Sequence, residues 1–150
     1  MKVRPSALIW RQNAHQIDVL LMRYCYGGED VFALPGGNPD RGEILPETIV
    51  REIREELGIS VDVGGMILAG EMLLTQRNDD VLHIVFEARN LQGEPTLNPA
   101  ETTALDVVWQ PVSDLSGLNL YPNIGAKIQA WFERAVDLGY VGRIEQRYFG

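Results

Sequence analysis

The stretch that decides the interpretation of this chain is GNPDRGEILPETIVREIREELGI, residues 37–59. Its second half predicts a helix from about Pro46 to Leu57, because proline is favoured at a first helical position and Gly58 follows as a natural C-terminal cap. Leu45, where the N-cap is expected, is not one of the polar residues that usually cap a helix. We therefore expect a polar loop followed by a helix of about three turns.

Three glutamates fall on one face of this predicted helix. At roughly 100° per residue, Glu52, Glu55 and Glu56 share an arc of about 100°. An apolar stripe beside them would dock the helix on a sheet, and it consists of Ile49, Ile53 and Leu57. The carboxylates repel one another, and clustered carboxylate oxygens are ligands that Mg²⁺ prefers. The pattern favours a metal site, although an ordinary solvated acidic face also fits the three glutamates taken alone.

The wider spacing resembles a known motif, the Nudix box, G-x5-E-x7-R-E-U-x-E-E-x-G-U, in which U is aliphatic. Every fixed position matches, from Gly37 through Glu43 and Arg51 to Ile59. At average composition, a chance match has a probability on the order of 10⁻¹⁰ per starting position. The chain is therefore identified as resembling the Nudix hydrolase family over these 23 residues.

The resemblance implies a fold and a reaction. The fold would be α/β (α+β), an α/β/α sandwich with a mixed β-sheet between helices, and we expect residues 1–150 to form a single domain. The reaction would be Mg²⁺- or Mn²⁺-dependent hydrolysis of a phosphoanhydride bond in a nucleoside diphosphate linked to another moiety. The alternative is a catalytically silent Nudix-like domain that senses a nucleotide. Such domains usually lose box glutamates, and none is lost here.

The same resemblance assigns roles within the box. Glu43 and Arg51 would form an ion pair that holds the motif together. The metal ligands would be Glu52, Glu55, Glu56 and the main-chain carbonyl of Gly37. Glu55 and Glu56 rank first as the general base that activates the attacking water.

Two positions outside the box are candidates for substrate binding, Arg23 and Glu101. Arg23 ends a predicted strand that often reaches the phosphates in this family. Glu101 lies in a loop before the strand at Trp109, and it is also the distant candidate for the general base. For each of the two residues, a charge simply exposed to solvent is the alternative.

The rest of the chain predicts further strands and one more helix. After Tyr121 and Pro122, apolar residues recur at helical spacing. Those positions are Ile124, Ile128, Trp131, Ala135 and Leu138. The expected strands are 7–10, 18–23, 31–34, 61–63, 67–74, 81–88 and 106–109. From residue 139 onward no period is evident, and strands and helices do not alternate regularly, which favours a mixed sheet.

Composition limits the partners. The net charge of −8 disfavours nucleic acid, so a small anionic substrate would need a local positive field from metal ions or a few arginines. Cys25 is the single cysteine and no long apolar run occurs, so we expect a soluble, cytoplasmic protein without membrane contact. A homodimer is an open alternative to a monomer, with the aromatic tail at 147–149 as one candidate contact. The identity of the nucleotide derivative stays open.

Overall fold

The structure is a computed structural model that describes residues 1–74 and 79–146. The predicted contact through the tail at 147–149 lies outside the described residues. The elements in chain order are β1 (Lys2–Asn13), β2 (Gln16–Tyr26), β3 (Glu29–Ala33), α1 (Leu45–Leu57), β4 (Ser60–Met72), β5 (Val81–Gln92), β6 (Asp106–Pro111), η1 (Val112–Gly117), β7 (Leu120–Tyr121), α2 (Gly125–Arg134) and β8 (Gly139–Arg143).

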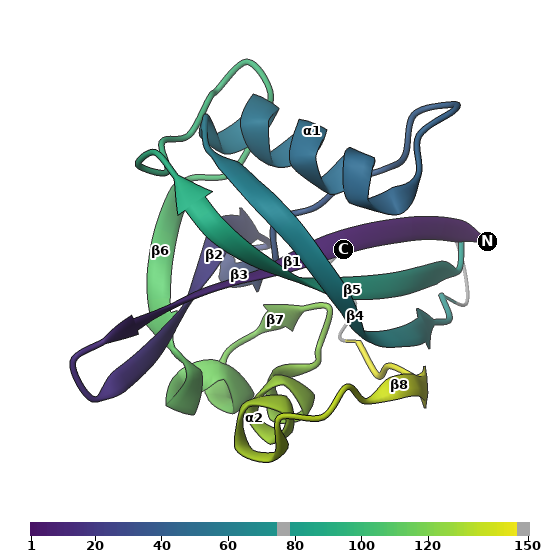
Figure 1. Ribbon diagram of the computed structural model, residues 1–150. Coiled ribbons are helices and arrows are strands. Elements are labelled where there is room, and N and C mark those ends of the chain that lie inside the picture. The colour runs from purple at the N-terminus through teal and green to yellow at the C-terminus, as the bar shows by residue number, and fades with distance from the viewer. Residues whose placement is uncertain (75–78, 147–150) are drawn as a thin grey trace.

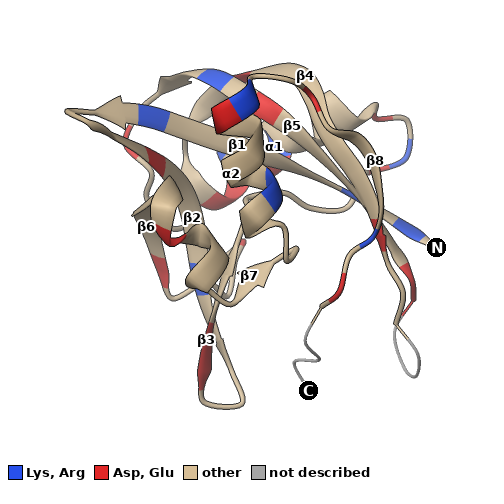
Figure 2. Ribbon diagram, turned by 90° about the horizontal axis from the view of Figure 1, so that it is seen from below, with Lys and Arg blue, Asp and Glu red and all other residues tan. Residues whose placement is uncertain are grey.

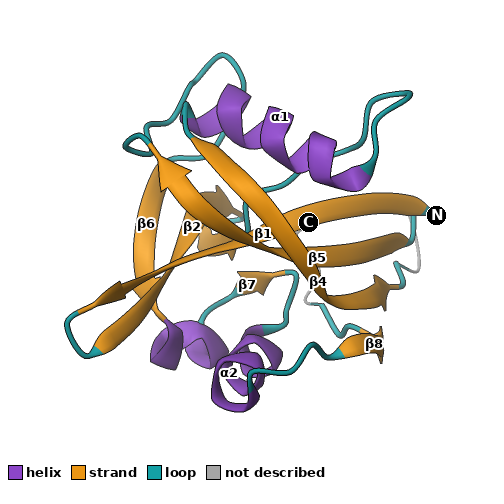
Figure 3. Cartoon of the chain, in the orientation of Figure 1, coloured by secondary structure: helices purple, strands orange, loops and turns teal. Residues whose placement is uncertain are grey.

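The strands form one mixed sheet between two helical layers. Its order is β7-β3-β2-β1-β5-β4-β8, with β6 paired to β2. Parallel pairs, such as β1 with β5, occur beside antiparallel pairs, such as β4 with β5. Helix α1 covers one face, and η1 and α2 cover the other (Figure 1; Figure 3). The predicted α/β/α sandwich with a mixed sheet is confirmed.

Two apolar cores fill the space between sheet and helices. The core beneath α1 contains the predicted stripe of Ile49, Ile53 and Leu57, each at most 1% exposed. The core on the other face gathers around Ile124 and Ile128 at α2. Because the stripe of α1 is buried, its glutamates are held at the edge of the sheet.

The sheet opens along the first half of β1. There β1 pairs with β5, from Lys2 to Ile9, and it meets β2 only from Trp10 onward. The segment that follows β3 crosses this opening, since Ala7 N donates to Pro35 O at 2.8 Å and Gly37 N donates to Pro5 O at 3.2 Å. The loop that leads into α1 is thereby fixed to β1.

The structure differs from the sequence-based predictions in several elements. One bulged strand, β4, runs where two were expected. Helix α2 ends at Arg134 instead of reaching Leu138, because Ala135 adopts a left-handed conformation and turns the chain back towards β4. The segment from residue 139 onward, in which the sequence shows no period, contains β8, which pairs parallel with β4. Within the described ranges, no helix has the length and apolarity needed to cross a membrane.

Candidate active site

The loop and helix of residues 37–58 are held at both ends. The N-cap of α1 is Ile44, whereas the sequence predicted Leu45. Glu47 Oε1 accepts a hydrogen bond from Ile44 N at 3.0 Å, which replaces the missing polar N-cap. At its end, Gly58 takes the left-handed conformation that favours glycine, with φ of 67°. The glutamate-bearing turns between them are therefore fixed in position.

A second loop docks on the last turn of α1. Asn98 donates from its backbone to Glu56 O at 2.9 Å and from Nδ2 to Glu55 O at 3.2 Å. These bonds satisfy carbonyls that a helix end leaves without partners. They also bring the loop that carries Glu101 beside the glutamate face.

Arg51 links the loop to the helix. Its Nε donates to Glu43 Oε2 at 2.7 Å and its Nη2 to Glu43 Oε1 at 3.0 Å. The Nη1 group donates to Glu52 Oε1 at 3.0 Å and to Glu55 Oε2 at 3.2 Å. Hydrogen bonds from Arg51 lower the pKa of Glu43 to about 2. One guanidinium thus orients three carboxylates, and the structure contains the Glu43–Arg51 pair.

Glu52 lies directly against the backbone of Gly37. A Cβ at position 37 would be 2.4 Å from Glu52 Cδ, so no larger residue fits there without displacing the carboxylate. Burial raises the pKa of Glu52, and Arg51 opposes that shift. The structure therefore places a carboxylate and the glycine backbone, two predicted ligands, side by side.

Glu56 is half-buried at the centre of the charged group. Its pKa is raised to about 7, chiefly by burial and also by the charges of Glu52, Glu55 and Glu101, while the charge of Arg4 opposes the shift. Glu101 itself is exposed. The arrangement thus concentrates negative charge around a carboxylate that is already partly removed from water.

This donor set fits a hard divalent cation, which prefers carboxylate and carbonyl oxygens. In the ranges that the structure describes, no three acidic, His or Cys side chains are already gathered as an ion cage. The Nη1 group of Arg51 engages one oxygen each of Glu52 and Glu55. A cation would therefore compete with Arg51 for these oxygens.

The structure does not bring Arg23 into this group. Its Nη1 pairs with Asp30 Oδ1 at 3.1 Å across the β2–β3 hairpin. A residue that the sequence did not single out, Arg4, lies closer to the glutamates, as its effect on Glu56 indicates. No motif marks Arg4, and only the pairing of its neighbour Pro5 with Gly37 shows that it borders the box.

Comparisons with known proteins identify the family and the fold of this chain. The family model described as NUDIX domain matches residues 2–132. The comparison with curated proteins gave no match.

Solved structures share the fold. A solution structure of the E. coli ORF135 protein has 19% identity and a TM-score of 0.72, with 91% of each chain covered. A MutT NUDIX hydrolase from Burkholderia pseudomallei has 24% identity and a TM-score of 0.63, covering 75% of this chain and 84% of that one. The NUDIX domain of Shewanella oneidensis NrtR, complexed with ADP ribose, has 19% identity and a TM-score of 0.63, covering 91% and 89%.

Proposed function

The chain belongs to the NUDIX domain family and is a Nudix hydrolase, and from this premise we propose that it cleaves a phosphoanhydride bond in a small nucleotide derivative with a divalent cation bound at α1. The observation that carries the proposal is the cluster of Glu52, Glu55 and Glu56 on one face of α1, oriented by Arg51. We further propose that residues 1–150 act as one domain, since both cores pack on the same sheet.

The metal ligands in this proposal are the three clustered glutamates and the main-chain carbonyl of Gly37. Bound there, Mg²⁺ or Mn²⁺ would neutralise the carboxylates, polarise phosphate oxygens and lower the pKa of a coordinated water. The close packing of Glu52 on Gly37 supports this set. Arg51 acts as a positioning residue, because it fixes the direction of two of the carboxylates.

Glu56 is the first candidate for the general base. Among the described residues, no hydrogen bond reaches its side chain, whereas Arg51 holds those of Glu52 and Glu55. In the proposed step, a water oxygen bonds to phosphorus as its proton passes to a Glu56 carboxylate oxygen. The bond from phosphorus to the bridging oxygen breaks, and the bridging oxygen leaves with the second phosphate. Glu55 and Glu101 are the alternative proton acceptors.

The substrate class that fits is a nucleoside diphosphate joined to another moiety. A phosphoanhydride provides the negative charge that a metal-loaded site would bind, and Figure 2 shows the Lys and Arg positions scattered singly over the described chain rather than joined in a basic surface for nucleic acid. Nucleoside triphosphates, ADP-ribose and other nucleotide sugars all belong to this class.

A phosphate-release screen over these derivatives tests the proposal. Each is incubated with Mg²⁺, with Mn²⁺ and with EDTA, and a phosphatase that acts only on the exposed monophosphate products reports cleavage. We expect turnover of at least one derivative in the metal samples and none in EDTA. Tight binding without turnover would favour the nucleotide-sensor alternative, and turnover that persists in EDTA would contradict the metal proposal.

A further inference from the structure

Arg4 lies on β1 where the sheet opens, with its side chain partly buried. Its Nη2 donates to Leu34 O at 3.2 Å, and its Cζ is 5.2 Å from the centroid of the Tyr121 ring. Its Nη1 is buried and has no hydrogen-bond partner among the described residues. The guanidinium is thus held on two sides, while one of its donor groups remains unused.

This state differs from that of the other arginines that the structure describes. Arg11, Arg23, Arg51, Arg89 and Arg143 form ion pairs with carboxylates. No ion pair of Arg41, Arg54 or Arg134 occurs within the described residues, but these three are exposed and water can hydrate them. Burying a charged donor without a partner is costly, so Arg4 indicates an anion that the described residues do not supply.

The position of Arg4 relative to the box is fixed by the backbone. The next residue, Pro5, accepts the hydrogen bond of Gly37 N, and Gly37 supports the Glu52 carboxylate. Burial raises the pKa of both Tyr24 and Tyr121, and the nearby charge of Arg4 lowers it. Arg4 is therefore within electrostatic reach of both tyrosines and of Glu56 on the glutamate face.

His83, beside Arg4, does not add to the positive charge. It neighbours Arg4 on β5, and its ring packs edge-on against Tyr121 with centroids 5.2 Å apart. Burial, together with the charge of Arg4, lowers its pKa to about 3, so the imidazole is neutral near pH 7. The positive charge at this corner of the described structure thus comes from Arg4.

We propose that Arg4 binds the phosphate oxygens of the substrate, across the site from the glutamates of α1. The proposal rests on the proposed function and adds a contact to it. A planar guanidinium presents parallel N–H donors that match phosphate oxygens, and a chain with net charge −8 needs such a local attraction to bind an anion. The contact of Arg4 with Tyr121 and Leu34 sets the direction of the donors before the substrate arrives.

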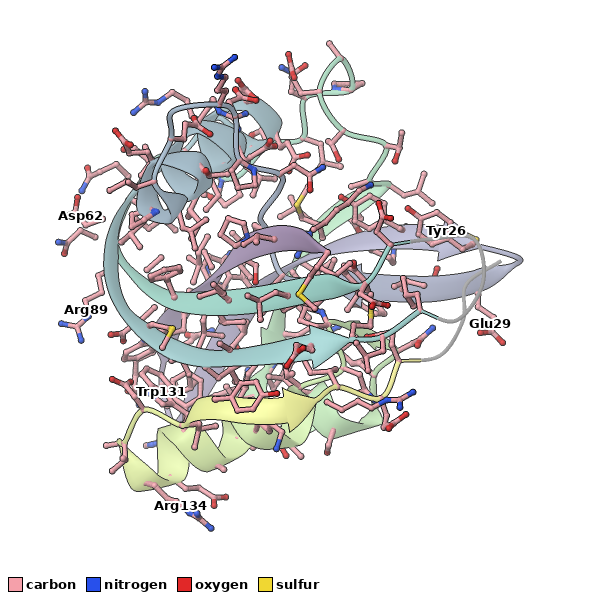
Figure 4. All side chains as sticks on the ribbon, turned by 90° about the vertical axis from the view of Figure 1, so that its right-hand side faces the viewer. Tyr26, Glu29, Asp62, Arg89, Trp131 and Arg134 are labelled. Carbon is pink, nitrogen blue, oxygen red and sulfur yellow. The ribbon has the colours of Figure 1, made fainter. Side chains whose placement is uncertain are left out.

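Binding of a nonhydrolysable probe tests this contact without requiring turnover. Calorimetry with α,β-methylene-ADP and Mg²⁺ compares the wild type with Arg4→Gln, which removes the charge but keeps a donor for Leu34 O. Arg134→Gln is the matched control, because Arg134 extends from the end of α2 on the far side of the sheet from α1 (Figure 4). We expect binding about 10- to 100-fold weaker in Arg4→Gln. The control should bind like the wild type.

Adenosine, which has no phosphate, separates a phosphate contact from a packing role. Its affinity should be the same in the wild type and in Arg4→Gln. Equal losses for the two probes, or wild-type affinity for α,β-methylene-ADP, would overturn the proposal. If Arg4→Gln does not fold, Arg4→Lys decides, because it keeps the charge and loses the planar fork. Several-fold weaker binding of α,β-methylene-ADP alone would then support the contact, and unchanged binding would exclude it.

These outcomes are distinguishable from a failure of the proposed function. A protein that binds α,β-methylene-ADP through Arg4 but hydrolyses no derivative would retain the contact and lose the catalytic proposal. If a variant without Arg4 hydrolyses a derivative at the normal rate and affinity, the proposed function stands and the Arg4 contact is excluded.

Discussion

Two clusters of acids and arginines lie on opposite faces of the sheet, and they differ in charge balance. At α1, Arg51 is within 3.2 Å of oxygens from four carboxylates, those of Asp40, Glu43, Glu52 and Glu55. On the α2 side, Glu87 accepts from Arg89 Nη2 at 2.6 Å and from Trp10 Nε1 at 3.0 Å. Arg89 and Trp131 mark that second cluster in Figure 4.

The difference in charge balance supports a structural role for the Glu87 cluster and the proposed functional role for the α1 cluster. Glu87 is only 6% exposed, but each of its oxygens has a donor and its charge has one partner. The α1 cluster contains more negative charge than Arg51 can neutralise, and Glu56 adds a carboxylate without a described donor. A satisfied carboxylate needs nothing further, whereas the excess of negative charge at α1 supports the cation site that we propose there.

The largest expected effect comes from the same isosteric change made in both clusters. Glu56→Gln should lower kcat about 100-fold or more, because it removes the proposed proton acceptor and one metal ligand while preserving shape. Glu87→Gln should leave kcat within about twofold, although it weakens charged hydrogen bonds. Steady-state kinetics at saturating Mg²⁺ measures both, and circular dichroism checks the fold. A near-normal rate in Glu56→Gln would remove the distinction between the clusters.

A smaller effect, on stability, is expected at the Glu87 cluster. Trp10→Phe deletes the indole donor to Glu87 Oε2 and keeps an aromatic ring against Phe132. Because hydrogen bonds to charged groups are worth more than neutral ones, the free energy of unfolding should fall by about 1–2 kcal/mol. Urea denaturation measures this change. Turnover should stay at the wild-type value, and a loss of activity that exceeds the loss of folded protein would show that this face contributes to catalysis.

The sequence predicted the α1 cluster because its order is local. Residues three and four apart share a helix face, so the spacing of Glu52, Glu55 and Glu56 already determines their common direction. The resemblance to the Nudix box likewise allowed the pairing of Glu43 with Arg51 to be anticipated. Loop positions such as Glu101 were less certain, since its approach to Glu56 depends on how Asn98 hydrogen-bonds to the helix end.

The remaining features depend on pairings between distant segments. Arg4 borders the box only because β1 runs beside the loop at Gly37, and no spacing within the chain shows this. In the sequence, the apolar spacing of α2 continues beyond the end of the helix, because Leu138 packs in the same core after the chain has left α2. Strand β8 exists through its parallel partner β4, and a pattern confined to residues 139–143 does not reveal that partner.

The smallest expected effect concerns the pH dependence of stability at the α1 cluster. Hydrogen bonds from Arg51 lower the pKa of Glu43 to about 2 in the folded state, from an ordinary value of 4.5. A depressed folded pKa means that the stabilisation is fully present above pH 4.5 and is lost as the pH falls towards 2. Glu43→Gln removes this contribution, so its thermal midpoint should be lower than that of the wild type at pH 6 and the gap should narrow between pH 4.5 and pH 2. Scanning calorimetry across that range measures the gap. If the difference between the two thermal midpoints stayed constant with pH, the pKa of Glu43 would be the same in the folded and unfolded states. The charge of Glu43 would then not count towards the excess of negative charge that distinguishes the α1 cluster from the Glu87 cluster.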